Sequence, residues 1–151
     1  RIASLRLTSG TTAVHSDMIE WNLKETPENV GRAIINAIFG VIQYSAMLRD
    51  IPQEHLEVMQ KWIAFADEHR ETLLQSEFRP YHPELGYPVI EAESDTERIV
   101  AVYQDNVVVE TAPRGKRLYI LNASGSERIV IRRGEKLRTV KVPCGDWKEV
   151  K

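Results

Sequence analysis

Apolar and polar residues follow two different patterns along the chain, and the pattern changes near residue 78. Before this point apolar residues recur every three or four positions, the period of an α-helix with one face in a core. After it, short apolar runs are separated by turn residues, which is typical of β-strands joined by tight connections. The sequence therefore predicts a helical first half and a β-rich second half.

The first half contains two predicted helices with a predicted strand between them. A helix is expected over residues 26–39, because the Thr26 hydroxyl can cap its first turn and Pro27 is tolerated at the first helical position. Residues 41–48 are apolar and partly β-branched, as in a buried parallel strand, and residues 50–75 predict a long helix. This order is that of βα units. Two such units cannot close a sheet, so we expect them to end a larger parallel sheet.

The second half begins with a segment that is predicted to be a linker. Residues 79–88 contain three prolines and one glycine, which neither a helix nor a central strand accommodates. The chain is thereby divided into residues 1–78, this linker and residues 89–151. Turn residues separate six predicted strands at a spacing of about ten residues, which favours an antiparallel β-sandwich or barrel. The predicted strands cover residues 89–92, 98–103, 107–111, 117–122, 128–131 and 137–142.

Composition and charge exclude several classes of partner. Residues 1–78 carry 7 basic and 11 acidic side chains, a net charge of −4, which argues against a regulator with a DNA-binding helical half. No apolar run approaches the roughly 20 residues that cross a bilayer. We therefore expect neither a nucleic-acid nor a membrane partner.

The residues that commonly bind metals are few and poorly spaced. Cys144 is the single cysteine, so the chain has no intrachain disulfide and no cysteine-based zinc site. His55 and His69 lie 14 residues apart on the predicted long helix, where they are expected to face solvent. We therefore expect no metal and no other cofactor.

Four short motifs occur in an order that resembles a known family. They are TAVHSDM at residues 12–18 with Trp21 nearby, FGV at residues 39–41, HRETLL at residues 69–74 and FRPYHPE at residues 78–84. In this respect the chain resembles the bacterial α-galactosidase (melibiase) family of glycoside hydrolases. The resemblance is strongest over residues 5–84.

The resemblance implies the C-terminal part of a retaining hydrolase that acts on terminal α-linked galactose. The expected fold is the last βα units of a (β/α)8 TIM barrel followed by an antiparallel β-sandwich. Retention needs two carboxyl groups about 5 Å apart across the scissile bond. In the family both stand on earlier barrel strands, so we expect no catalytic residue within this chain and no activity of the chain alone.

The same resemblance points to four substrate-binding residues. Asp17 is expected at the C-terminal end of a barrel strand, where its carboxylate would accept hydrogen bonds from sugar hydroxyls. Met18 would form an apolar wall beneath the sugar ring. His15 and Trp21 are further candidates, the first to orient Asp17 and the second to stack on the sugar. The expected partner is an α-galactoside, bound together with the earlier part of the barrel.

One alternative function remains open, and one further property is expected. The second half could be a carbohydrate-binding or structural module without activity. Such modules usually expose aromatic platforms, whereas Tyr103 and Tyr119 lie within apolar runs and are expected to be buried. An incomplete barrel would also expose the apolar sides of its last strand and helix. We therefore expect self-association.

Overall fold

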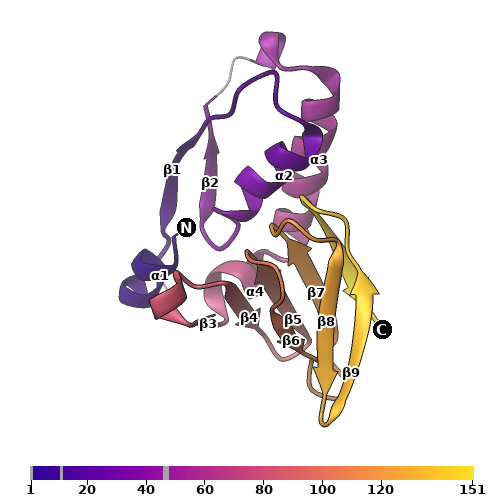
Figure 1. The fold of residues 1–151 in the computed structure, drawn as a ribbon. Helices are drawn as coiled ribbons and strands as arrows, with labels where there is room; N and C mark the ends of the chain where they lie inside the picture. The colour runs from indigo at the N-terminus through magenta and orange to yellow at the C-terminus, as the bar shows by residue number, and fades with distance from the viewer. Residues whose placement is uncertain (1, 11, 46–47) are drawn as a thin grey trace.

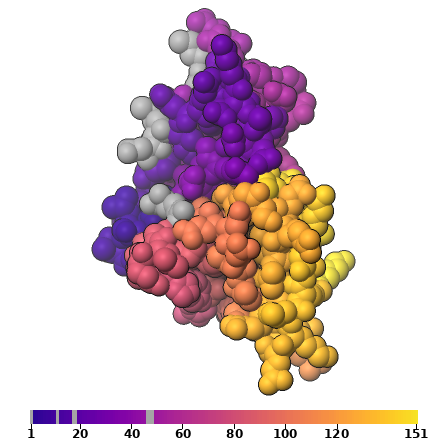
Figure 2. Space-filling view, in the orientation of Figure 1, coloured from indigo at the N-terminus to yellow at the C-terminus, as the bar shows by residue number. Residues whose placement is uncertain are grey.

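The structure, a computed structural model, describes residues 2–10, 12–45 and 48–151, with only the backbone described at residues 17, 18 and 48. The fold is mixed α+β, with a helical part stacked on a part made of strands (Figures 1 and 2). The first part contains α1 (Ala3–Ser9), β1 (His15–Ile19), α2 (Pro27–Ile35), β2 (Val41–Tyr44), α3 (Gln53–Glu68) and α4 (Arg70–Gln75). The second contains β3 (Glu77–Tyr81), β4 (Val89–Glu93), β5 (Glu97–Val102), β6 (Val108–Glu110), β7 (Arg117–Asn122), β8 (Arg128–Arg133), β9 (Lys136–Lys141) and β10 (Asp146–Val150). Two short 3-10 helices occupy Leu48–Asp50 and Pro83–Leu85.

The unit β1–α2–β2 confirms the predicted strand after Gly40 and the predicted helix start. Thr26 Oγ1 accepts a hydrogen bond from the Asn29 N–H at 3.2 Å, and Pro27 is the first helical residue. Strands β1 and β2 pair in parallel. The predicted strand is longer than the observed one, which ends at Tyr44, and residues 46 and 47 lie outside the described part of the chain.

Helix α2 ends four residues earlier than predicted, because the backbone tightens after Ile35. The N–H groups of Ala37, Ile38 and Gly40 donate to carbonyls only three residues back, so the chain forms turns there instead of a continued α-helix. The side chains of residues 37–39 remain buried. The apolar pattern of residues 37–39 therefore predicts their burial correctly, but it does not predict where the helix ends.

The predicted long helix is divided at His69 into α3 and α4. His69 has φ −104° and ψ 18°, outside the helical region, and its imidazole contacts Glu97 on β5. Both predicted solvent-facing histidines are in fact buried, with His55 0% and His69 2% exposed. The prediction was wrong because both rings have polar partners in other elements, which periodicity along one helix cannot reveal.

A five-stranded sheet of order β10–β7–β5–β4–β3 forms the centre of the molecule. Its edge strand β3 includes residues 79–81, which the sequence analysis assigned to a linker. Pro80 pairs in register with Ile90. An edge strand needs ladder hydrogen bonds on one side only, and a proline is therefore tolerated there. A three-stranded sheet of order β6–β8–β9 packs against one face of the first.

Strand pairing in the second half is not purely antiparallel, contrary to the expectation. The pairs β5–β7 and β6–β8 are parallel, and the pairs β3–β4, β4–β5, β7–β10 and β8–β9 are antiparallel. The difference arises because β6, between β5 and β7 in the chain, belongs to the other sheet. The chain returns from it to the five-stranded sheet in its original direction.

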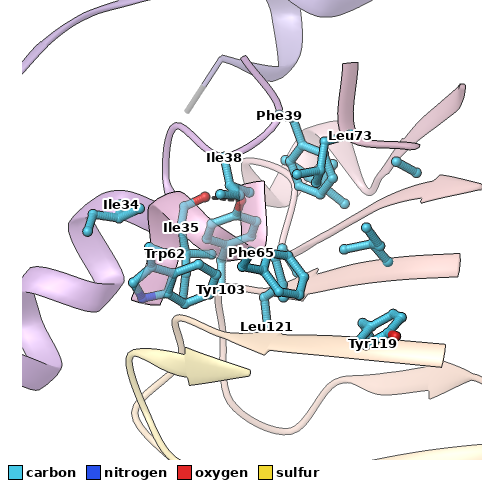
Figure 3. Packing of buried hydrophobic residues seen from close by; sticks show 14 of the residues in the cluster. Ile34, Ile35, Ile38, Phe39, Trp62, Phe65, Leu73, Tyr103, Tyr119 and Leu121 are labelled. Atoms are coloured by element: carbon cyan, nitrogen blue, oxygen red, sulfur yellow. Dashed lines mark hydrogen bonds between the residues drawn. The ribbon is translucent and has the colours of Figure 1, made fainter. Parts of the chain in front are cut away.

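The five-stranded sheet is the middle layer, because its central strands are buried on both faces. On β5, Ile99 and Ala101 join a core with α2, α3 and α4, whereas Val100 and Val102 join a second core with β6 and β8. Figure 3 shows the first core, to which α2, α3 and α4 contribute side chains together with Tyr103 and β7. The predicted burial of Tyr103 and Tyr119 is confirmed. One continuous apolar core therefore joins residues of the first and second halves.

The two halves also meet through close backbone contacts. The Tyr103 hydroxyl donates to the Ile35 carbonyl at 2.9 Å, and the Trp62 indole donates to the Gly145 carbonyl at 3.3 Å (Figure 3 shows the former). A Cβ built on Gly31 of α2 would lie only 1.9 Å from the same carbonyl oxygen. Helix α2 thus rests directly on the turn before β10, where a side chain larger than hydrogen has no room.

Candidate functional site

The carboxyl ends of β1 and β2 lie at one edge of a small parallel sheet, and Trp21 follows the end of β1, whereas His15 is the first residue of β1 and lies at the opposite edge. The register pairs His15 with Val41, Met18 with Gln43 and Ile19 with Tyr44, with an irregularity between His15 and Met18. Both Asp17 and Met18 lie within β1, but their side chains are outside what the structure describes. Their expected roles toward a sugar therefore remain predictions.

Polar side chains connect the two strands along their length, starting from the first residue of β1. The His15 Nδ1 lies 3.4 Å from Gln43 Nε2, and Ser16 Oγ accepts a hydrogen bond from the Gln43 N–H at 3.1 Å. Beyond the strand ends, the Ser45 hydroxyl donates to Glu20 Oε1 at 3.4 Å. Neighbouring donors and acceptors at a sheet edge are the kind of groups that can bind hydroxyls of a ligand.

Trp21 is held by packing as well as by a hydrogen bond. Its indole N–H donates to His55 Nδ1 at 3.1 Å, and its ring makes an edge contact with Tyr44 at a centroid distance of 6.5 Å. Because an indole only donates, His55 Nδ1 is the acceptor, and His55 Nε2 donates to the Glu25 carbonyl at 2.8 Å. His55 is thus a fully paired structural group that fixes the loop after β1.

Replacing Trp21 by Phe should lower the free energy of unfolding by about 1–3 kcal/mol, because His55 Nδ1 would be buried without its donor. Urea unfolding measures this change. Trp147→Phe is the matched control, because the Trp147 indole N–H has no hydrogen-bond partner among the described residues. Equal losses in both variants would contradict a stabilising Trp21–His55 hydrogen bond.

An open hollow of about 350 Å³ lies beside the end of β1 and under α2. Polar side chains dominate its lining, and none of the six was singled out from the sequence: Glu20, Asn22, Glu25, Asn29, Arg32 and Asn36. The signal was weak because they come from a loop and from one face of a helix that is otherwise buried. Trp21 also lines this hollow, so its ring borders both the core and the open space.

A second hollow of about 470 Å³ runs along β2, α3 and α4. It is mainly apolar, and Ile63, which lines it, is 48% exposed. Burial raises the pKa of Tyr44, at the end of β2, to about 12. This apolar surface has no partner element among the described residues.

A buried polar network around Glu97 was missed entirely by the sequence analysis. Glu97 Oε1 accepts hydrogen bonds from His69 Nδ1 at 2.9 Å and from the Thr72 hydroxyl at 2.7 Å. Arg117 Nη2 donates to Oε2 at 3.1 Å. Glu97 is 4% exposed and His69 is 2% exposed, and the His69 ring is packed between those of Phe65 and Tyr119. This burial closes the carboxylate and the imidazole to a ligand, so the network serves to join α3 and α4 to the central sheet.

No match was found when the chain was compared with family models, with curated proteins and with solved structures. Among the described residues, no cluster of His, Cys, Asp or Glu could hold a metal ion. Across the same residues, no helix has the length and apolar character needed to traverse a bilayer. A functional assignment therefore rests on the motifs and on the geometry of the strand ends.

Proposed function

We propose that the chain is the C-terminal part of a retaining α-galactosidase-type glycoside hydrolase. The observation that carries the proposal is the parallel β1–α2–β2 unit. Strand β1 contains the end of the TAVHSDM motif, the FGV motif leads into β2, and both strands end at the same edge of the sheet. In barrel enzymes, substrates are bound at the carboxyl ends of the parallel strands. The chain would supply part of the sugar pocket and a stabilising β-rich part.

The small parallel sheet supports this proposal because it is incomplete by itself. Parallel sheets occur almost only where both faces are covered, and two strands alone are marginally stable in water. Among the residues that the structure describes, β1 and β2 pair only with each other, and the apolar hollow beside β2 is of the kind that further elements of a barrel would cover. The remaining strands would then come from the earlier part of the polypeptide.

The polar hollow after β1 supports the proposed sugar pocket. Glu20, Asn22 and Asn36 offer both donors and acceptors, and Trp21 adds an apolar ring beside them. A pyranose has hydroxyls at its rim and an apolar C–H face, so such a mixture is suited to it. We propose that Asp17 and Met18 contact the sugar from β1, with His15 orienting the carboxylate.

The proposed division of labour follows from the chemistry of retention. One carboxyl group attacks the anomeric carbon and a second protonates the leaving oxygen, and the resulting glycosyl-enzyme is then hydrolysed. In the proposal both groups come from the preceding barrel strands, whereas Asp17 holds the substrate. The chain alone would then bind a sugar weakly and hydrolyse nothing.

The decisive experiment is to express the chain together with its upstream coding region and to assay p-nitrophenyl α-galactoside. We expect hydrolysis with retained configuration, seen by proton NMR, and no turnover by the chain alone. In the longer protein Asp17→Asn should lower kcat/KM by about 10- to 100-fold, since it removes hydrogen bonds from a charged acceptor.

Asp95→Asn is the control variant, because Asp95 is exposed in the turn between β4 and β5 and does not belong to the β1–β2 sheet. It should leave kcat/KM unchanged. An upstream region that encodes no barrel, or a longer protein without activity on any α-glycoside, would sink the proposal. It would leave the carbohydrate-binding or structural module as the better reading.

The unpartnered apolar surface leads to a prediction about the chain in isolation. Self-association should bury the hollow that contains Ile63, and the sedimentation coefficient should rise with concentration. Ile63→Glu should reduce this association by placing a charge on the surface. Leu137→Glu, on the exposed strand β9, is the control and should not change it. A clean monomer at high concentration would contradict the prediction.

A further inference from the structure

The five-stranded sheet extends beyond the edge of the three-stranded sheet that covers it. Glu91 on β4 is aligned with Arg79 on β3 and with Val100 on β5. Because Val100 belongs to the core shared with β6 and β8, Glu91 and Arg79 face the same side. Strand β6 is an edge strand of the smaller sheet. A recess of about 360 Å³ lies beside β6, over β3, β4 and β5, where the smaller sheet stops covering the larger one.

The floor of this recess is polar, although the neighbouring part of the same sheet face is apolar. Glu91 is only 4% exposed, and its Oε1 accepts hydrogen bonds from Arg79 Nη1 at 2.9 Å and from the Tyr81 hydroxyl at 2.7 Å. A buried carboxylate lowers stability unless it is well paired. An apolar residue at the position of Glu91 would avoid this cost of burying a charge. A pocket on which several polar groups converge is a common mark of a binding site.

Every charged group of the recess already has a partner of opposite charge. Arg98 Nε bonds to Glu93, and its Nη1 donates to the Thr111 carbonyl at 3.1 Å. At the rim, Arg132 Nε donates to Glu110 Oε1 at 2.6 Å. A charged ligand would have to compete with these pairs. A neutral ligand with many hydroxyls would not, since each hydroxyl can accept from a guanidinium and donate to a carboxylate.

The aromatic and apolar groups fit the same class of ligand. Tyr81 is 39% exposed at the recess, and its hydroxyl is committed to Glu91, so the ring is held in place. Burial and the Glu91 carboxylate raise the pKa of Tyr81 to about 12. Val89 and the half-exposed Val108 add apolar surface. A pocket that combines apolar surface with a few placed polar groups is typical of small-molecule sites, and a saccharide, with its hydroxyls and C–H faces, matches both kinds of surface.

We propose that this recess between the two sheets binds a neutral saccharide, at a site separate from the strand ends of β1 and β2. Arg79, Glu91 and Arg98 would bind its hydroxyls, Tyr81 would cover a C–H face of the ring, and Glu110 and Arg132 would form the rim. The site lies wholly within the second half of the chain. It therefore does not depend on the proposed hydrolase activity.

Saturation-transfer difference NMR of the 151-residue chain tests this site, with melibiose and maltose as neutral probes and galacturonate as the anionic probe. We expect signals from the neutral sugars. Val108→Trp places an indole at the recess, where Val108 is one of the lining residues, and should abolish them. Tyr81→Ala should weaken binding about tenfold, the effect of losing one aromatic contact.

Thr139→Trp is the matched control, because Thr139 lies on β9, two strands away from β6 in the same sheet. It should leave the signals unchanged. The absence of saccharide signals would overturn the proposal, and so would signals that persist in Val108→Trp. Binding of galacturonate without binding of the neutral sugars would show instead an anion site.

Discussion

Gly31→Ala should destabilise the protein by about 3 kcal/mol or more, although alanine is the better helix former. Helix propensity alone predicts a gain of about 1 kcal/mol from this substitution within α2. The new Cβ, however, would lie 1.9 Å from the Gly145 carbonyl oxygen and 2.8 Å from its carbon. Both atoms are backbone, so the helix and the turn before β10 must separate.

Urea unfolding measures the sign of this effect directly. Separation would also weaken the hydrogen bond from the Trp62 indole to the Gly145 carbonyl, so Trp fluorescence should change in the folded state. Gly125→Ala is the control, because its Cβ would meet only the flexible Asp105 side chain at 3.1 Å. It should change stability by no more than about 0.5 kcal/mol. An unchanged or raised stability of Gly31→Ala would refute the close contact.

Glu97→Ala should cost about 3–5 kcal/mol, because it leaves three donors of a buried network without their acceptor. His69 Nδ1, the Thr72 hydroxyl and one Arg117 nitrogen all bond to this carboxylate. The loss should fall on the junction between α4 and the central sheet. Thermal unfolding followed by circular dichroism measures the total effect.

Two further variants complete this test: Glu97→Gln separates the buried charge from its hydrogen bonds, and Glu127→Ala is an exposed control. Glu97→Gln keeps the size and one acceptor oxygen, and should cost less than Glu97→Ala. Glu127→Ala removes an exposed ion pair with Lys141 and should cost no more than about 1 kcal/mol. If Glu97→Ala were no more harmful than Glu127→Ala, the network would have no role in stability.

The fold could be predicted where local pattern and tertiary structure agree. The predicted strand over residues 117–122 matches β7, and the cap at Thr26 is observed. Strands β3 and β10 were missed because Pro80 suggests a linker and because Trp147 and Val150 are too few apolar residues to suggest a strand. Both are edge strands, whose sequence is only weakly constrained by burial.

The apolar runs of the central strands indicate strands that are covered on both faces, which the spacing of the strands does not. Residues 99–102 are apolar without alternation, which is typical of a strand covered on both faces. The structure accordingly places β5 between two cores. Hairpin-like spacing favoured antiparallel neighbours, and it could not report that β6 belongs to a second sheet.

The candidate site was predictable only in part. Motif order led to His15 and Trp21, and the structure places Trp21 just beyond the carboxyl end of β1, against Tyr44, whereas His15 begins β1 and reaches Gln43 from the amino end of the strand. The partners of His55 and His69 lie in other elements, so helical periodicity placed both rings wrongly on the solvent side. Residues separated by tens of positions meet only through tertiary packing.

The two sheets of the second half are interleaved along the polypeptide. After β5 the chain enters the smaller sheet at β6, returns at β7, leaves again for β8 and β9, and returns at β10. No single cut between β5 and β10 separates one sheet from the other, so this part of the chain should fold and unfold as one cooperative unit. The elements before β3 form a contiguous stretch that docks on this unit. A recombination event at the boundary before β3 could therefore exchange the helical part while leaving both sheets intact, whereas one between β5 and β10 would divide the five-stranded sheet.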